Sequence, residues 1–78
     1  MSEPIPPEVD RFLNYSMSIS HQLIDYMKEH KLTKYGLARQ VGIKNSCIND
    51  WLSGMNNFTI RTLALIETKL NIKFKIME

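Results

Sequence analysis

A glycine at position 42 separates two short stretches of helical pattern, and this pair constrains the fold more than any other feature of the chain. Before the glycine, Leu37, Ala38 and Val41 recur at the spacing of one helix face, and residues 45–52 continue such a pattern after it. Glycine commonly ends a helix because it adopts the left-handed backbone conformation without strain. The chain is therefore expected to fold around two short helices joined by a tight turn at Gly42.

The helix expected over residues 45–52 has two unlike faces. Ile48, Trp51 and Leu52 lie at positions i, i+3 and i+4 and share an apolar face. The opposite face carries Asn45, Ser46, Asn49 and Asp50. Residues of these types compete with the helix backbone for hydrogen bonds, whereas an ordinary solvated face more often carries Lys, Glu and Gln. The polar face is therefore predicted to contact a ligand.

A long helix is expected near the N-terminus, because apolar residues recur at helical spacing from Glu8 to about His30. A break in this helix would fall between residues 16 and 20. Residues 1–18 are expected to form a tail and the start of the helix, and residues 19–71 are expected to form the folded domain.

Threonine residues predict two of the helix starts. Thr33 precedes the first short helix and Thr59 precedes a last helix, and each hydroxyl can accept a hydrogen bond from a free backbone N–H group. Phe58 and Leu63, on either side of the second cap, are placed for a hydrophobic contact that fixes the direction of the helix. The predicted core consists of Leu23, Met27, Leu37, Ala38, Val41, Ile48, Trp51, Leu63, Ile66 and Leu70.

The C-terminal residues 72–78 follow the period of a half-buried strand, because Ile72, Phe74 and Ile76 alternate with lysines. A lone strand is not stable in water, so pairing with the same segment of a second copy is expected to form a two-fold homodimer. The alternatives are that the segment pairs with a protein partner, folds back on its own chain or is disordered. If a chain without residues 72–78 were still dimeric, the dimer contact would lie elsewhere, on the long N-terminal helix. The expected fold class is all-α, with four or five helices, to which a short C-terminal β-strand can be added.

Composition argues against several classes of protein. With 78 residues, of which 44% are hydrophobic, the chain can form one domain. The single cysteine, Cys47, cannot form an internal disulfide, and no cluster of Cys and His predicts a metal site or a cofactor. No nucleophile with a neighbouring base and no pair of carboxylates predicts catalysis. No membrane span or signal peptide is predicted either, so a cytoplasmic location is expected.

Charge is unevenly distributed along the chain. Residues 1–30 contain two basic and five acidic residues, whereas residues 31–77 contain eight basic and two acidic residues. The two short helices lie in the basic part. This favours a polyanionic partner, because neutralisation of phosphates supplies much of the affinity of proteins for nucleic acids.

Two short helices joined at a glycine, the second with a polar outer face, indicate a helix-turn-helix unit, in which the second helix lies in the major groove of DNA. Short amide and hydroxyl side chains read base edges there, and the helix Asn45–Leu52 presents such side chains. Arg61 lies in the first turn of the last helix, where a cation opposes the helix dipole. A phosphate bound at that position would explain its presence.

The run LTKYGLARQVGIKNSCINDWLSG resembles the phage-repressor type of helix-turn-helix family (Cro/cI, XRE-like). The resemblance rests on Leu32, Leu37, Ala38, Val41, Gly42, Ile43, Ile48, Trp51 and Gly54. The following run GMNNFTIRTLALIETKL is similar to the small bacterial regulators and HigA-like antitoxins of that family. The resemblance implies that bases are contacted by Asn45, Ser46, Asn49 and Asp50. It implies that phosphates are contacted by Thr33, Lys34, Lys44, Asn56, Asn57, Thr59 and Arg61.

The resemblance implies a sequence-specific regulator of transcription, and in particular a repressor, that binds double-stranded DNA as a homodimer. The alternative is a HigA-like antitoxin, which binds a protein toxin and autoregulates its operon. The toxin would then be expected to need residues 1–18 or residues 72–78.

Overall fold

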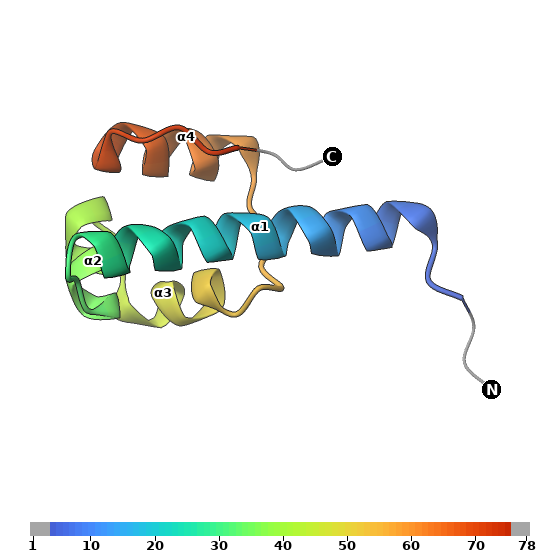
Figure 1. The fold of residues 1–78 in the computed structure, drawn as a ribbon, viewed down its shortest axis with the longest axis horizontal. Helices are drawn as coiled ribbons and strands as arrows, with labels where there is room; N and C mark the ends of the chain where they lie inside the picture. Colours follow the sequence, from blue (N-terminus) through green and yellow to red (C-terminus); the bar gives the residue numbers. More distant parts are fainter. Residues whose placement is uncertain (1–3, 76–78) are drawn as a thin grey trace.

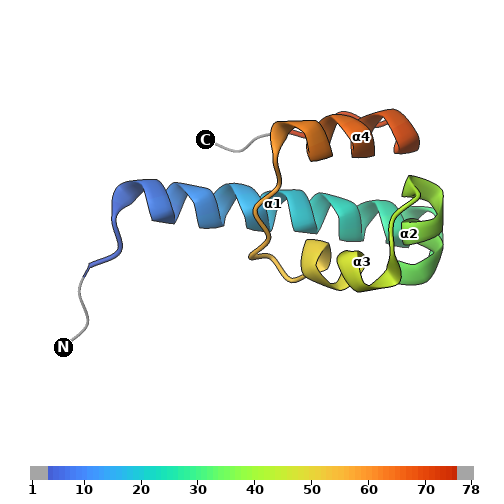
Figure 2. The same cartoon turned by 180° about the vertical axis from the view of Figure 1, so that it is seen from behind.

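The computed structural model describes residues 4–75, and this part of the chain contains four helices and no strand. The helices are α1 (Pro7–Glu29), α2 (Lys34–Val41), α3 (Asn45–Leu52) and α4 (Ile60–Leu70). In Figure 1, α4 lies above α1, α3 lies below it, and α2 lies at one end; Figure 2 shows the same arrangement from behind. The predicted all-α fold class is confirmed.

One core joins the four helices. Its buried apolar side chains are Ile19, Leu23, Leu37, Ala38, Val41, Ile48, Trp51, Ile66 and Leu70. Met27 and Leu63, which were predicted to be core residues, are only partly buried, and Ile19 is a core residue missing from the prediction. The Trp51 ring lies against Phe58 with 6.0 Å between ring centroids. Trp51 is therefore a packing residue, as its shared face with Ile48 indicated.

The predicted helix ends are confirmed by their hydrogen bonds. Thr33 Oγ1 accepts a hydrogen bond from Gly36 N at 3.0 Å. Thr59 Oγ1 accepts one from Thr62 N at 3.1 Å. Gly42 ends α2 with a left-handed φ of 86°, a conformation in which a side chain would be strained. These three residues therefore set the positions of the short helices that carry the candidate site.

Helix α1 is continuous, as the long helix expected from the sequence, and it has no break between residues 16 and 20, where two serines bond to other segments of the chain. Ser20 Oγ donates to the backbone oxygen of Trp51 at 2.6 Å. Ser16 Oγ donates to the backbone oxygen of Asn56, also at 2.6 Å. Both serines are buried, and neither hydroxyl competes with the hydrogen bonds of α1 itself. They attach α1 to the end of α3 and to the loop that follows.

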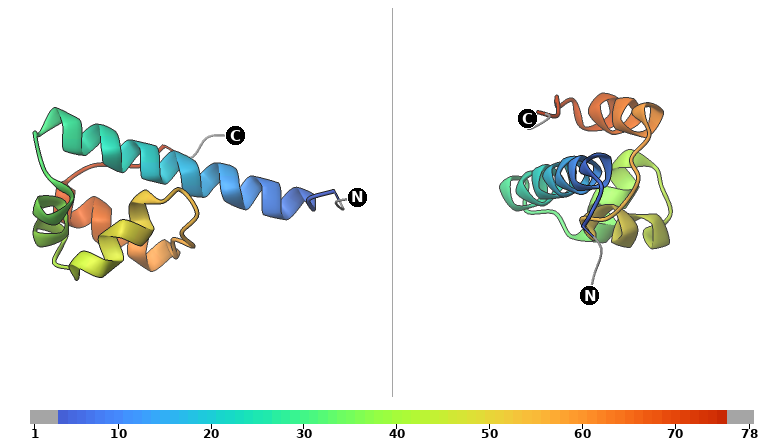
Figure 3. Two further views of the ribbon diagram at one scale, coloured as in Figure 1. Left: turned by 90° about the horizontal axis from the view of Figure 1, so that it is seen from below. Right: turned by 90° about the vertical axis from the view of Figure 1, so that its right-hand side faces the viewer.

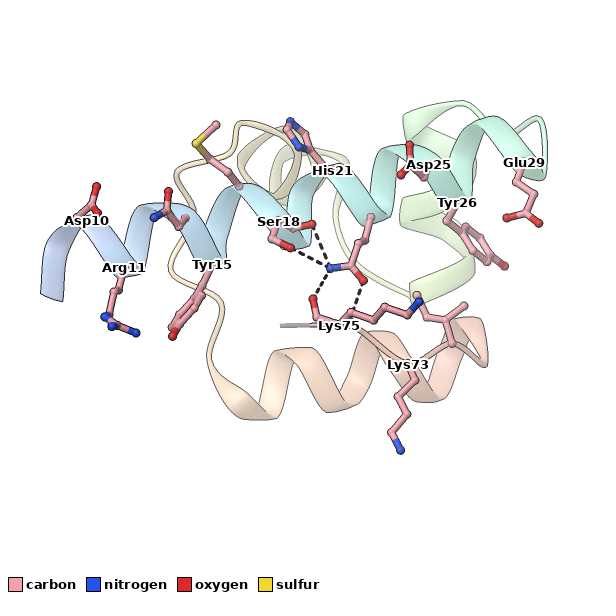
Figure 4. Close-up of a pocket in the computed structure, with 14 residues that line it drawn as sticks. Asp10, Arg11, Tyr15, Ser18, His21, Asp25, Tyr26, Glu29, Lys73 and Lys75 are labelled. Carbon is pink, nitrogen blue, oxygen red and sulfur yellow. Dashed lines mark hydrogen bonds between the residues drawn. The ribbon is translucent and has the colours of Figure 1, made fainter. Parts of the chain in front are cut away.

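The expected C-terminal strand is also not present over residues 72–75, and Ile76 lies outside the described residues. The side chain of Gln22 in α1 binds the backbone of this segment (Figure 4). Gln22 Nε2 donates to Lys75 O at 2.7 Å, and Gln22 Oε1 accepts from Lys75 N at 2.9 Å. One side-chain amide thus takes the place of a neighbouring strand.

The apolar residues of the same segment pack onto their own chain. Ile72 and Phe74 are partly buried against the core, and Phe74 N donates to Glu67 Oε2 at 2.8 Å. The alternation with Lys73 and Lys75, which are exposed, follows from this packing. Residues 72–75 therefore fold back onto their own chain, which was one of the alternatives to pairing with a second copy.

The N-terminal part of α1 extends beyond the rest of the protein (Figure 3). The elongated molecule measures 43 × 22 × 22 Å along its principal axes. One face of this helix carries Val9, Phe12, Ser16 and Ile19 at spacings of three and four residues. Ser16 and Ile19 are buried, whereas Val9 and Phe12 are 40% and 37% exposed. The face that α1 buries in the core therefore continues, still apolar, along the projecting part of the helix. We call Val9 and Phe12 the projecting stripe.

Candidate nucleic-acid interface

Helix α3 is held by one face and exposes the other. Ile48 is fully buried and Trp51 is 8% exposed, so these two side chains fix the rotation of the helix about its axis. The outer face holds the predicted base-contacting residues Asn45, Ser46, Asn49 and Asp50, all of which are exposed. The fold thus brings the four short polar side chains together on one accessible surface.

The start of α3 has no side-chain cap. Lys44 occupies the N-cap position with an extended backbone, and its side chain is exposed. The first backbone N–H groups of a helix have no partner within the helix, and an anion can accept hydrogen bonds from them. A lysine beside such groups adds a positive charge, so this end of α3 is suited to a phosphate.

A hydrogen bond between α2 and α3 joins residues that were predicted to have separate roles. Lys34 Nζ donates to Asn49 Oδ1 at 3.0 Å. Lys34 also lies 5.6 Å from the centroid of the Tyr35 ring, which is 53% exposed. Sequence analysis assigned no role to Tyr35. The sequence did contain one indication that Tyr35 lies on this surface, because an aromatic residue directly follows the basic Lys34 at the start of a helix.

The remaining residues predicted to contact phosphates follow α3 in the sequence, in the loop after it and at the start of α4. Asn57 and Arg61 are exposed, and Asn56 is half-buried with its backbone oxygen bonded to Ser16. The hydroxyl of Thr59 accepts the capping hydrogen bond and lies 2.9 Å from Thr62 Oγ1. Thr59 therefore serves first as a cap, whereas Arg61 extends from the first turn of α4 toward solvent.

A hollow in the structure lies away from this surface, between α1 and residues 72–75 (Figure 4). Its lining mixes acidic side chains of α1, such as Asp25 and Glu29, with Lys73 and Lys75. Within residues 4–75, no group of three or more His, Cys, Asp or Glu is placed to hold a metal ion. No helix in that part of the chain is long and apolar enough to cross a membrane.

Comparison with known proteins identifies one similarity. The family described as HTH_3: Helix-turn-helix matches residues 23–76, which include the C-terminal end of α1, from Leu23 to Glu29, and all of α2, α3 and α4. No curated protein and no solved structure matches the chain. The matched region contains the whole of the polar outer face of α3.

Proposed function

We propose that this chain is a sequence-specific repressor that inserts α3 into the major groove of double-stranded DNA. The proposal starts from the family of the chain, which belongs to the helix-turn-helix family of XRE-type DNA-binding regulators. The observation that carries the proposal is the division of α3 into a buried face, Ile48 and Trp51, and an exposed face of short polar side chains. Amides and hydroxyls of this kind form hydrogen bonds with base edges. The protein would act in the cytoplasm, where its operator is found.

In this proposal, two groups of residues at the candidate interface have different roles, because one contacts bases and the other contacts phosphates. Asn45, Ser46 and Asn49 form hydrogen bonds with base edges, and Asp50 accepts from the amino group of cytosine. Phosphates on either side of the groove are bound by Thr33, Lys34, Lys44, Asn56, Asn57, Thr59 and Arg61. These contacts fix the protein on the duplex without discriminating among sequences.

The experiment that tests the proposal is selection of bound duplexes from a random pool, with wild type and Asn49→Ala. We expect the wild type to enrich a defined sequence and Asn49→Ala to lose preference at particular base pairs by about 1–3 kcal/mol. Lys69→Ala is the matched control, because Lys69 is an exposed residue in the last turn of α4. If Asn49→Ala weakened binding to selected and random duplexes equally, α3 would not be the recognition helix.

The proposed repressor is a homodimer whose contact is the projecting stripe. Val9 and Phe12 continue the core-facing side of α1 into solvent, and burial against an identical helix would remove this apolar surface from water. The backbone of residues 72–75 is already bonded to Gln22 and Glu67, which leaves α1 as the better candidate than strand pairing. Two copies would present two α3 helices to half-sites about 34 Å apart.

Substitution of the projecting stripe tests the dimer. We expect Phe12→Asp to convert a dimer to a monomer in analytical sedimentation, because it places a charge in the buried contact. Asn14→Asp adds the same charge at an exposed position of the same helix and should remain dimeric. A wild-type monomer would disprove the dimer, and a dimeric Phe12→Asp protein would move the contact elsewhere.

The second candidate is a HigA-like antitoxin whose projecting stripe binds a protein toxin instead of a second copy. The same exposed apolar residues, Val9 and Phe12, support it. It predicts that a small basic protein co-purifies with the chain and that removal of residues 1–18 releases it. The repressor proposal predicts that DNA and a second copy are sufficient.

A further inference from the structure

The hydrogen bond between Lys34 and Asn49 determines how the amide of Asn49 is oriented. The lysine ammonium has three donors and no acceptor, so the atom that faces it at 3.0 Å must be the amide oxygen Oδ1. The amide nitrogen Nδ2, with its two protons, then points away from Lys34. Both side chains are exposed on the surface that contains the outer face of α3.

The position of Lys34 at the start of α2 explains why its ammonium is stabilised by the bond to Asn49. Lys34 is the first residue of α2, where the positive end of the helix dipole disfavours a cation. The hydrogen bond to the amide oxygen of Asn49 and the contact with the ring of Tyr35 offset that cost. The ammonium is therefore held beside α3 by two contacts.

We propose that Lys34 and Asn49 act together as a donor-only reader that selects guanine at the base pair facing Asn49. The inference rests on the proposed function, in which α3 lies in the major groove. With Oδ1 bonded to Lys34, the pair presents N–H donors from Nδ2 of Asn49 and from Nζ of Lys34. Guanine offers two acceptors, N7 and O6, in the major groove, and the two kinds of donor match them.

Adenine is the base that the pair disfavours. An unassisted asparagine reads adenine by accepting from the N6 amino group through Oδ1 and donating to N7 through Nδ2. In this protein the adenine amino group would approach an oxygen that already faces a positively charged donor. In this inference Lys34 contacts a base in place of the phosphate assigned to it above, so it is a specificity-determining residue, and removal of its charge frees Asn49 for adenine.

Selection of duplexes from a random pool with three variants tests this inference. Asn49→Ala identifies the base pair that Asn49 faces, because preference there is lost. Lys34→Met keeps the length of the side chain but removes its donors, and Lys44→Met is the matched control at another exposed lysine of the interface. Thermal melting of each variant checks that the fold is retained.

We expect the wild type to select guanine at the base pair identified with Asn49→Ala. Lys34→Met should lower the preference for guanine over adenine at that base pair by about tenfold, within the range of one bidentate contact. Lys44→Met should weaken binding to all sequences alike.

Two results would overturn the inference alone: adenine selected by the wild type at that base pair, or a Lys34→Met protein that weakens all sequences alike, as a plain phosphate contact would. A wild-type protein that enriches no sequence would overturn the proposed function together with the inference.

Discussion

Substitution of Ser20 by alanine should destabilise the protein although it removes only one oxygen atom. Ser20 is 1% exposed, and its hydroxyl donates to the backbone oxygen of Trp51 in the last turn of α3. That oxygen has no partner within the helix, because the last carbonyl groups of any helix lack one. Ser20→Ala therefore leaves a buried acceptor unsatisfied.

The size of the effect follows from two opposing contributions. A buried acceptor without a partner costs about 2 kcal/mol. Alanine in place of serine within a helix regains about 0.5 kcal/mol. The free energy of unfolding should thus fall by about 1.5 kcal/mol, which corresponds to a decrease in melting temperature of about 6–12 °C for a domain of this size.

Thermal unfolding followed by circular dichroism, with urea unfolding as a second measurement, tests this prediction. Ser46→Ala is the matched control, because Ser46 is exposed on the outer face of α3, and its melting temperature should change little. Ser16→Ala should have an intermediate effect, because the oxygen it would leave belongs to the half-buried Asn56. If Ser20→Ala melted at or above the wild-type temperature, the hydrogen bond to Trp51 would not stabilise the fold.

Three further predictions concern the core, the interface and the C-terminal segment. Trp51→Ala should cost about 3–5 kcal/mol through the cavity it leaves, and an unchanged melting temperature would place that ring on the surface. Arg61→Ala should weaken binding to all DNA sequences alike and make the dependence of log K on log salt concentration shallower by about one; a loss confined to one sequence would contradict its phosphate role. Gln22→Ala should speed hydrogen exchange of the Lys75 amide, measured by NMR, and unchanged exchange would show that the side chain does not hold residues 72–75.

The parts of the fold that sequence analysis predicted correctly are those fixed by local chemistry. A threonine cap acts on an N–H group three residues away, as Thr33 does on Gly36 and Thr59 on Thr62. Helical spacing in turn identified which face of α3 is buried. These features depend only on residues close together along the chain, so they can be predicted from the sequence.

The errors arose where the partner of a side chain lies far along the chain. The partner of Ser20 is 31 residues away, and the partner of Ser16 is 40 residues away, so the serines suggested a weak helix rather than buried hydrogen bonds. Gln22 and Lys75 are 53 residues apart, and without that pairing residues 72–78 had the pattern of a strand. Such contacts follow from the packing of α1 against the other segments, which no local pattern specifies.

The candidate site shows the same limit. The exposure of Asn45, Ser46, Asn49 and Asp50 agrees with their predicted face, and their contacts with bases stay a prediction. The bond between Lys34 and Asn49 connects two helices, and it depends on how α2 and α3 pack together. Side chains could therefore be assigned to a surface from the sequence, but the pairing between them could not.

The two faces of α3 also determine how readily such a protein can change its target during evolution. Ile48 and Trp51 hold the helix in place, and the outward side chains make no contribution to the core. If these side chains contact bases as proposed, substitutions at positions 45, 46 and 50 would alter the preferred DNA sequence with little effect on the stability of the fold. Position 49 is different, because its side chain is bonded to Lys34 on another helix. A lineage that acquires a new residue at position 49 is expected to change position 34 as well, and the same two positions should be randomised together when new DNA specificities are selected in the laboratory.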